Sequence, residues 1–404
     1  MSNMGKISRE LTLKYALLQS VFWICQCFVL GFANVYLKSR GFDNTQVGIT
    51  LSLASVLSII IQPLVAGFAD RTTKVSLRTI TMVLMLIVLS LGIILVIIPD
   101  SYIFITICFM FIMAIQITLV SLLNSLALEY MNLGIHMNYG LARGISSIAF
   151  SLTSFGFGIV LNYHSGNILL PIFLVSYVLF IAALILFRID TSSLPLPEKE
   201  VIETEQKQSD GIFKFLKNYK KFTILLVGMT MVMYSHNLIN TYLINIVENV
   251  GGDNTDMGLS LAIAAGLELP TMAVFILIVK KIKCSTLLKI SAFFFFIKSG
   301  IVWLAPNMLT INLSQLLQLF AYALFTPASV YYVNEIIDAK NGVKGQSMVG
   351  VATFSLVGAI GSFTGGRILD TKGVSAMLLV GTIVTGIGFI IVCLSTEDAK
   401  KDVR

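Results

Sequence analysis

The sequence predicts an all-α membrane protein with twelve transmembrane helices in two pseudo-symmetric six-helix bundles. Of its 404 residues, 56% are hydrophobic and only 12% are charged, which is too little charge to cover the surface of a soluble protein. The hydrophobic residues fall in runs of about twenty, the number that crosses a bilayer core about 30 Å thick. These runs divide evenly about one long polar connection.

Short polar breaks separate the twelve expected spans. The spans lie at 13–37, 45–69, 77–98, 101–131, 138–162, 168–188, 221–247, 256–279, 285–305, 308–336, 345–368 and 374–395. The first is not a cleavable signal, because Gln26 and Asn34 interrupt it and no small-residue cleavage site follows. The connection at 189–211 is polar and contains prolines, as solvated linkers do. We therefore expect an N-terminal bundle at 1–188, a cytoplasmic linker at 189–220, and a C-terminal bundle with a short cytoplasmic tail at 221–404.

The two halves repeat a motif at an offset of 210 residues. GFDNTQVGITLSLA at 41–54 matches GGDNTDMGLSLAIA at 251–264, and the Asp or Asn in each can cap the following helix. AFSL at 149–152 recurs as TFSL at 353–356. The matches favour an internal duplication; the alternative is a chance similarity between apolar helices.

Basic residues are distributed unevenly between the connections. If the N-terminus is cytoplasmic, the cytoplasmic segments hold 23 of the 28 Lys and Arg, and the external loops hold Lys38, Arg40, Arg367 and Lys372. Basic residues accumulate on the cytoplasmic side of membrane proteins. We therefore expect a multi-pass protein of a bacterial inner (plasma) membrane, with both termini in the cytoplasm.

Several classes of function are disfavoured. The net charge of +7 comes mostly from residues that flank spans, so it does not indicate nucleic-acid binding. The three histidines and five cysteines form no compact cluster with metal-ligand spacing, and we expect no metal or cofactor. No GxxxxGKS or GxxxxGKT loop is present, so we expect an ion gradient rather than ATP as the energy source. The absence of a nucleophile–base pair argues against an enzyme.

The segment after the second span resembles the loop signature of the major facilitator superfamily. In GFADRTTKVSLR (67–78), Gly67, Asp70 and Arg71 match the signature, while Thr73 stands where a glycine is usual. The resemblance implies two six-helix halves with the solute between them. It also implies that the three matching residues form a conformational loop, in which Asp70 caps or bridges helix ends.

Three further segments resemble one branch of this superfamily, the lactose permease-like and nucleoside:proton symporters. They are NYGLARGISSIAF (138–150), GLELP (266–270) and the glycine-rich span at 344–373. The resemblance implies that Arg143, Phe150 and Glu268 bind the solute. A snorkelling role is the alternative for Arg143, and plain packing is the alternative for Phe150.

The chain departs from this branch where lactose permease-like members carry ionisable residues. The positions concerned are Ser125 for the span-four acid, Asn237 and Asn240 for two aspartates, Lys298 for an arginine, and Gln318 and Ala321 for a histidine and a glutamate. Lactose is therefore not the expected solute, and the amides favour a nucleoside. Glu129 lies one turn from Ser125 and is kept as a proton-coupling candidate.

Glu268 is the only charge between Met257 and Val279. An ionisable residue at mid-membrane costs about 2.5 kcal/mol or more and usually faces a functional cavity. Pro270 removes a backbone donor and can open a kink beside it. Glu268 is thus expected to bind solute hydroxyls and to couple the proton, with Lys298 as a second coupling candidate. The alternatives are a structural glutamate and a snorkelling lysine.

Uncharged polar residues form stripes in other spans. Asn237 and Asn240 are three apart, and Gln318 and Tyr322 are four apart, so each pair shares a helix face. Gln26 stands in the first span. We expect these five residues to contact the solute; the alternative is that they hold neighbouring helices together.

The expected function is secondary active transport, by proton-coupled symport of a small polar solute such as a nucleoside or sugar through alternating access. The solute, the coupling proton and the bilayer are the expected partners, and the protein is expected to be monomeric. A proton-driven exporter of drugs or metabolites is the main alternative, and a transporter-like membrane sensor is another. Sodium coupling also remains open.

Overall fold

The computed structural model describes residues 3–72, 75–97, 101–135, 137–188, 211–338 and 341–398, and all regular structure within these ranges is helical. The chain divides into two compact units, Met1–Ile202 and Glu203–Arg404. The part of the expected linker at 189–210 lies outside the described residues.

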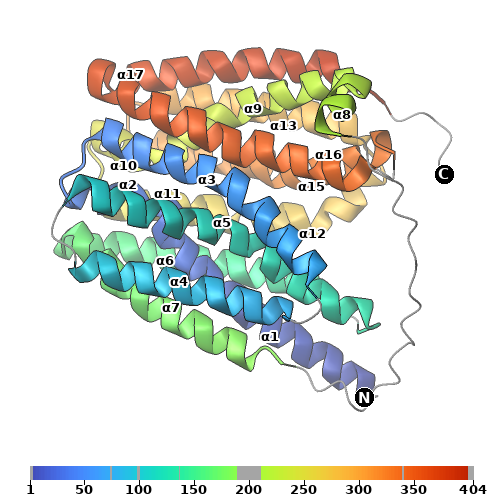
Figure 1. The fold of residues 1–404 in the computed structure, drawn as a ribbon. Helices are drawn as coiled ribbons and strands as arrows, with labels where there is room; N and C mark the ends of the chain where they lie inside the picture. The colour runs from blue at the N-terminus through green and yellow to red at the C-terminus, as the bar shows by residue number, and fades with distance from the viewer. Residues whose placement is uncertain are drawn as a thin grey trace. The chain divides into compact units, whose positions relative to one another are not determined.

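The first unit consists of seven α-helices in the ranges that the structure describes (Figure 1). They are α1 (Asn3–Gln26), α2 (Ala33–Ser39), α3 (Asn44–Arg71), α4 (Leu77–Ile97), α5 (Tyr102–Asn132), α6 (Tyr139–Tyr163) and α7 (Leu169–Leu186). A π-helical turn, Cys27–Gly31, joins α1 to α2, so these pieces together form the expected first span.

The second unit is more interrupted. Its helices are α8 (Ile212–Asn218), α9 (Lys220–Thr241), α10 (Leu243–Asn249), α11 (Asn254–Gly266), α12 (Glu268–Val279), α13 (Cys284–Trp303), α14 (Met308–Gln315), α15 (Tyr322–Ile336), α16 (Gly342–Gly350) and α17 (Leu356–Ser395). A 3-10 turn, Leu316–Leu319, follows α14, and a π-helical turn, Val351–Ser355, joins α16 to α17.

Ten helical segments in the described ranges are long and apolar enough to cross a membrane. Two local features relate this number to the twelve expected spans. The last segment, Gly342–Ser395, is interrupted at Gly373, where φ is 81° and ψ is 179°, and therefore holds spans eleven and twelve. Span eight is divided at Leu267 into α11 and α12, each too short to count by itself.

Equivalent helices contact each other in the two units. In the first unit α1 packs on α6 and α7, α3 on α5, and α4 on α5 and α7. In the second unit α9 packs on α17, α11 on α14, α12 on α15, and α13 on α15 and α17. Span by span, these are the same pairs, which supports the duplication that the repeated motif indicated.

The 210-residue repeat is also present in the backbone. Asp43 and Asp253 each accept a hydrogen bond from the residue three positions later and form a capping box, as the sequence predicted. Gly41 and Gly251 precede these caps with φ of 84° and 83°, a conformation that glycine adopts without steric cost. Because the same turn recurs, the chain enters its second and eighth spans in the same way.

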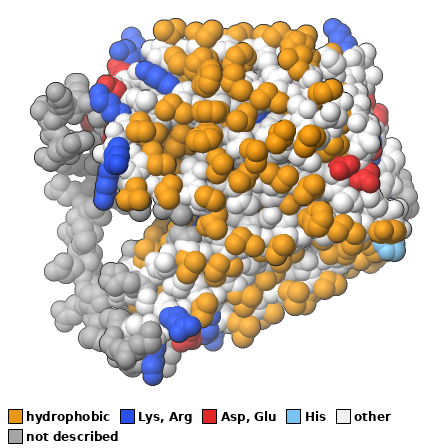
Figure 2. Space-filling model, turned by 180° about the vertical axis from the view of Figure 1, so that it is seen from behind, with side chains coloured by type: hydrophobic (Ala, Val, Ile, Leu, Met, Phe, Trp, Pro, Cys, Tyr) orange, Lys and Arg blue, Asp and Glu red, His pale blue; other side chains and the backbone are white. Residues whose placement is uncertain are grey.

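Hydrophobic side chains cover much of the face drawn in Figure 2, while the Lys and Arg side chains lie mainly toward its edges. Exposed apolar residues such as Leu64, Leu152 and Ile390 are suited to lipid contact. Inside each unit, large aromatic side chains such as Phe28, Phe173 and Tyr332 are almost fully buried. This combination is typical of a helical bundle in a bilayer.

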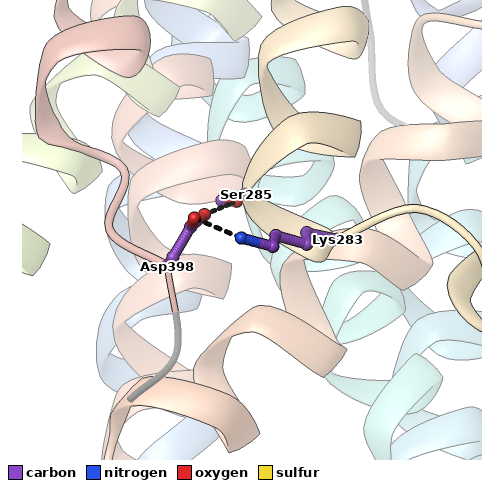
Figure 3. A network of polar contacts seen from close by, with 3 residues as sticks. All are labelled: Lys283, Ser285 and Asp398. Atoms are coloured by element: carbon purple, nitrogen blue, oxygen red, sulfur yellow. Dashed lines mark hydrogen bonds and ion pairs between the residues drawn. The ribbon is translucent and has the colours of Figure 1, made fainter. Parts of the chain in front are cut away.

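Polar contacts tie the segment after α17 to other helices of the second unit. Asp398 accepts hydrogen bonds from Lys283 Nζ at 2.5 Å and from Ser285 Oγ at 2.6 Å (Figure 3). Glu397 pairs with Lys221 at 2.5 Å and donates its backbone N–H to Tyr332 Oη at 2.8 Å. The bond from Lys283 is the main cause that lowers the pKa of the Asp398 carboxyl.

Candidate functional site

Arg143 lies near the start of α6 and is partly buried. Its guanidinium carbon Cζ is 4.1 Å from the centre of the Trp23 ring on α1, a cation–π contact. Nη1 donates to Ser146 Oγ at 3.1 Å, and that hydroxyl donates to the Arg143 carbonyl at 2.6 Å. Phe150, two turns further along α6, meets Trp23 edge to face with ring centres 6.1 Å apart. Arg143 and Phe150, both predicted to bind the solute, therefore contact the same ring, that of Trp23.

A hydrogen-bonded group of side chains lies next to Arg143. Tyr15 on α1 and Tyr139 on α6 both donate to Asn124 Oδ1 on α5, at 3.2 and 3.0 Å. Gln19 Nε2 donates to Tyr15 Oη at 2.6 Å. Both phenols lie within electrostatic range of Arg143. Because these bonds join three helices, they fix the start of α6 and hence the backbone that carries Arg143.

Gln26 is buried and serves a contact between helices. Its Nε2 donates to the carbonyl of Gln116 on α5 at 3.2 Å, and Tyr177 Oη on α7 donates to Gln116 Oε1 at 3.1 Å. Within the described ranges, Gln26 Oε1 and Gln116 Nε2 find no hydrogen-bond partner. Gln26 therefore holds α1 against α5, which was the alternative to solute binding. Its Oε1 and the Nε2 of Gln116 take no part in this contact.

The remaining predicted residues of the first unit lie near helix ends. Glu129 is exposed in the last turn of α5 and forms no ion pair with any residue that the structure describes. The expected conformational loop is largely helical, because α3 continues to Arg71 and includes Gly67 and Asp70. The side chains of Asp70 and Arg71 lie outside the described part of the structure.

In the second unit, Lys298 on α13 is buried, with 2% of its surface exposed. Its Nζ donates to Gln315 Oε1 at 2.8 Å and to Gln318 Oε1 at 2.7 Å. Both acceptors are neutral amides, so these bonds do not compensate the positive charge. The carboxylate of Glu268 lies within electrostatic range of the ammonium. The structure thus brings together three predicted residues, Glu268, Lys298 and Gln318.

Glu268 is the first residue of α12, directly after the break at Leu267. The break agrees with the kink expected from Pro270, which lies in the first turn of α12, where a missing N–H is tolerated. Thr271 Oγ1 donates to the carbonyl of Leu319 at 3.1 Å and holds this turn against the 3-10 segment that carries Gln318. The broken helix therefore places a carboxylate next to the Lys298 cluster.

His236 on α9 connects the other polar residues of this unit. Its ring stacks on Tyr322 at 5.1 Å between centres with an interplanar angle of 22°, and it meets the edge of Phe295 at 5.4 Å. Its Nε2 lies 3.0 Å from Asn240 Nδ2. Since an amide nitrogen only donates, Nε2 is the acceptor in this arrangement. The Lys298 side chain lies within electrostatic range of the His236 ring.

The pairs that were expected to share helix faces have separate partners. Asn237 packs against α17, where a Cβ built on Gly361 would lie 2.5 Å from Asn237 Oδ1, whereas Asn240 contacts His236. Gln318 and Tyr322 are not on one continuous helix, because the chain leaves the 3-10 turn at Phe320 and Ala321 before α15 begins. The prediction that Gln318 and Tyr322 share one face of a continuous helix was therefore wrong. Gln318 binds Lys298, while Tyr322 contacts His236.

Trp23, Ser146, His236 and Gln315 contact predicted residues directly but were not selected from the sequence. Trp23 lies three residues before Gln26, and Gln315 lies three before Gln318, so each extends a polar stripe by one helical turn. His236 lies four residues before Asn240, on the same face of α9. A search for additional polar or aromatic residues on the same faces would have found them.

Comparisons with known proteins agree with the architecture. Residues 20–380 match the MFS_1 like family. The uncharacterized transporter YwbF of Bacillus subtilis (strain 168) is 26% identical over 368 residues, which cover 89% of this chain and 87% of YwbF.

Solved structures show the same fold at low sequence identity. The nucleoside transporter NupG in a mutant form is similar with a TM-score of 0.77 and 13% identity, over 96% of this chain and 98% of NupG. A bacterial homolog of the human lysosomal transporter Spinster, in an inward-facing and occupied conformation, has a TM-score of 0.67 and 12% identity, over 95% and 96% of the two chains. The chain therefore belongs to the MFS_1 like family and is a non-enzymatic, multi-pass membrane transporter of the major facilitator superfamily.

Proposed function

We propose that this transporter is a proton-coupled symporter that takes up a small polar solute, with nucleosides and sugars as the first classes to test. The observation that carries the proposal is the buried Lys298 ammonium, held by two neutral amides within electrostatic range of Glu268. Ionisable groups in a membrane interior are expensive, and they are kept where they handle ions or solutes. The likeness to a nucleoside transporter supports nucleosides as the first class.

Glu268 is the proposed proton carrier. When it is ionised, the carboxylate balances the charge of Lys298 across the break between α11 and α12. When it is protonated, it becomes a hydrogen-bond donor, and the ammonium loses its counter-charge. Protonation thus changes both the charge and the hydrogen-bonding capacity of the cluster, which is what coupling to a solute requires. Asn240, Tyr322 and Gln318 are the proposed solute contacts around it.

Arg143 and Phe150 are the proposed solute contacts of the first unit. A guanidinium presents several N–H groups in one plane and can bind two solute oxygens at once. Phe150 offers a ring for stacking. Glu129 and the residues Asp70 and Arg71 near the end of α3 are proposed to act in coupling or in the conformational change.

The orientation follows the charge distribution. Both termini and the central connection are proposed to lie in the cytoplasm of a bacterial cell, since most basic residues then lie on the cytoplasmic side. The transporter is proposed to act as a monomer.

Uptake into proteoliposomes tests the proposal. Radiolabelled uridine and a disaccharide are offered under an imposed inward proton gradient, an inward sodium gradient, or no gradient. We expect accumulation that requires the proton gradient. Uptake that ignores both gradients rejects coupling. Outward movement of lipophilic dyes, without uptake of either solute, favours the exporter.

The Glu268→Gln variant tests whether Glu268 couples transport to the proton, because glutamine keeps the size and polarity of the side chain but cannot ionise. We expect loss of proton-driven accumulation with normal membrane insertion. Glu248→Gln, at an exposed position near the end of α10, is the matched control and should leave accumulation unchanged. Exchange of solute at equal concentrations by the Glu268 variant assigns the residue to coupling, whereas loss of exchange assigns it to binding. Full accumulation by this variant would mean that Glu268 is structural.

A further inference from the structure

α8 is a seven-residue helix directly before the seventh span, and the proposed function gives it no role. Its inner side is held by Phe215, which is fully buried and lies against the rings of Tyr219 and Phe222, with ring centres 4.9 and 6.0 Å apart. Across the bend at Tyr219, Thr223 Oγ1 donates to the carbonyl of Leu216 at 2.9 Å. α8 is therefore docked on the start of α9, at the end of the second unit where α17 ends (Figure 1).

The opposite side of α8 carries an exposed aromatic ring beside lysines. Phe213 is 91% exposed, and Lys217, four residues later, shares its helix face. Lys214 adjoins the ring in sequence, and both lysines are exposed. The segment 212–221 contains four lysines and no acidic residue. An exposed phenylalanine with lysines around it is typical of helices that lie in the plane of the membrane interface.

A second basic segment, KKIK at 280–283, lies next to the first. Lys221 pairs with Glu397, and Lys283 pairs with Asp398 (Figure 3). Because these two acids are adjacent in the chain, the start of α9 and the start of α13 lie at the same end of the unit. Each acid pairs with one lysine, so positive charge remains on both segments. The exposed lysines that form no ion pair with any residue in the described ranges are Lys217, Lys220, Lys280 and Lys281.

We propose that this basic surface binds the anionic headgroups of phospholipids in the surrounding bilayer, with the Phe213 ring inserted among the acyl chains. Its members are Phe213, Lys214, Lys217, Lys220, Lys280 and Lys281. An anionic headgroup supplies phosphate oxygens and a net negative charge that complement the ammonium groups. A zwitterionic headgroup brings its own cation, which offsets that attraction. Insertion removes the apolar ring from water, while the long lysine side chains keep their ammonium groups at headgroup level. The proposal does not depend on which solute is transported.

Quenching of tryptophan fluorescence by brominated lipid tests the proposal, because bromine quenches only an indole at short range. The chain has two tryptophans, so Phe213→Trp in a Trp23→Phe/Trp303→Phe background places a single reporter on α8. Two proteoliposome samples contain equal amounts of phosphatidylglycerol and phosphatidylcholine, and only the lipid that carries the bromine differs between them. One lysine near an anionic surface contributes about 1 kcal/mol, which is about fivefold in local concentration. We therefore expect brominated phosphatidylglycerol to quench about fivefold more strongly than brominated phosphatidylcholine.

The lysines are tested separately from the ring. Lys214→Gln/Lys217→Gln/Lys220→Gln in the reporter protein should make the two lipids quench alike and leave their summed quenching unchanged, because the indole stays inserted. Replacement of the same three lysines by arginine should keep the preference. Leu304→Trp in the background without the two native tryptophans is the matched control, since Leu304 is 69% exposed directly after the other end of α13 and no Lys or Arg occurs at 299–315. This control should show no preference between the lipids.

Three results would overturn the proposal. Equal quenching by both lipids in the reporter protein would mean that α8 inserts without recognising the headgroup. Absence of quenching by either lipid would mean that water, another segment or another protein surrounds the ring. A preference for phosphatidylglycerol that survives the three Lys→Gln substitutions would assign the recognition to other residues.

Discussion

Gly388→Ala is expected to destabilise the second unit by forcing α9 and α17 apart. A Cβ built on Gly388 would lie 2.7 Å from the backbone N of Val232, 2.8 Å from Met231 Cβ and 3.0 Å from the backbone O of Gly228. Two of these atoms belong to the α9 backbone, which cannot rotate away as a side-chain end can. Insertion of a methyl group into a well-packed contact costs about 1–3 kcal/mol, and the backbone clash favours the upper part of that range.

Gly300→Ala on α13 is the matched control. The nearest atom to its added Cβ, Thr382 Cγ2, is 4.0 Å away, which is ordinary contact. Replacing a helical glycine with alanine gains up to about 1 kcal/mol of helix propensity where there is room. The same propensity gain applies to Gly388, so the clash alone separates the two variants. Their free energies of unfolding should differ by about 1–3 kcal/mol, with Gly388→Ala the less stable.

Thermal unfolding in detergent measures the difference. A thiol-reactive fluorogenic dye reports unfolding, because Cys284 and three other cysteines are buried in the folded protein. For a unit of about 200 residues, 1 kcal/mol corresponds to about 2–4 °C in Tm, so the Tm of Gly388→Ala should lie about 2–12 °C below that of Gly300→Ala. Uptake should fall as well, since α9 carries His236 and Asn240. Equal Tm values for both variants and the parent would refute the close contact between α9 and α17.

Three further outcomes are expected. Asp43→Ala should lower stability by about 1 kcal/mol through loss of the capping box, whereas Asp43→Asn should cost much less; thermal unfolding compares them, and equal losses would contradict the capping role. The pKa of Asp398 is lowered by Lys283, so its stabilisation is present above the unfolded pKa of about 3.9 and is lost as pH falls through the lower folded value. The Tm difference between parent and Asp398→Asn should therefore be present at pH 7 and disappear in that acidic range; a difference that does not change with pH would contradict this. A cysteine placed at Ser192 in a Cys-free background should resist an impermeant thiol reagent added outside intact cells, and external labelling would overturn the proposed orientation.

Features that depend on neighbouring residues were predictable from the sequence. The span lengths follow from runs of apolar residues, since each helix must satisfy its own backbone hydrogen bonds in lipid. The caps at Asp43 and Asp253 lie within three residues of the N–H groups they bind, so the repeated motif predicted them. The break before Pro270 is equally local. Glu268 stood out because nothing else charged occurs between Met257 and Val279.

The partners of the site residues were decided by the tertiary structure. Trp23 and Arg143 are 120 positions apart, and Lys298 reaches two glutamines that lie on the following span. Asn237 packs against Gly361 of α17, and how closely α9 approaches that glycine is a quantity that helix periodicity does not contain. A sequence pattern assigns a side chain to a face of a helix. The helix opposite that face is set by the packing of the whole bundle, where contacts between distant residues compete for the same buried space.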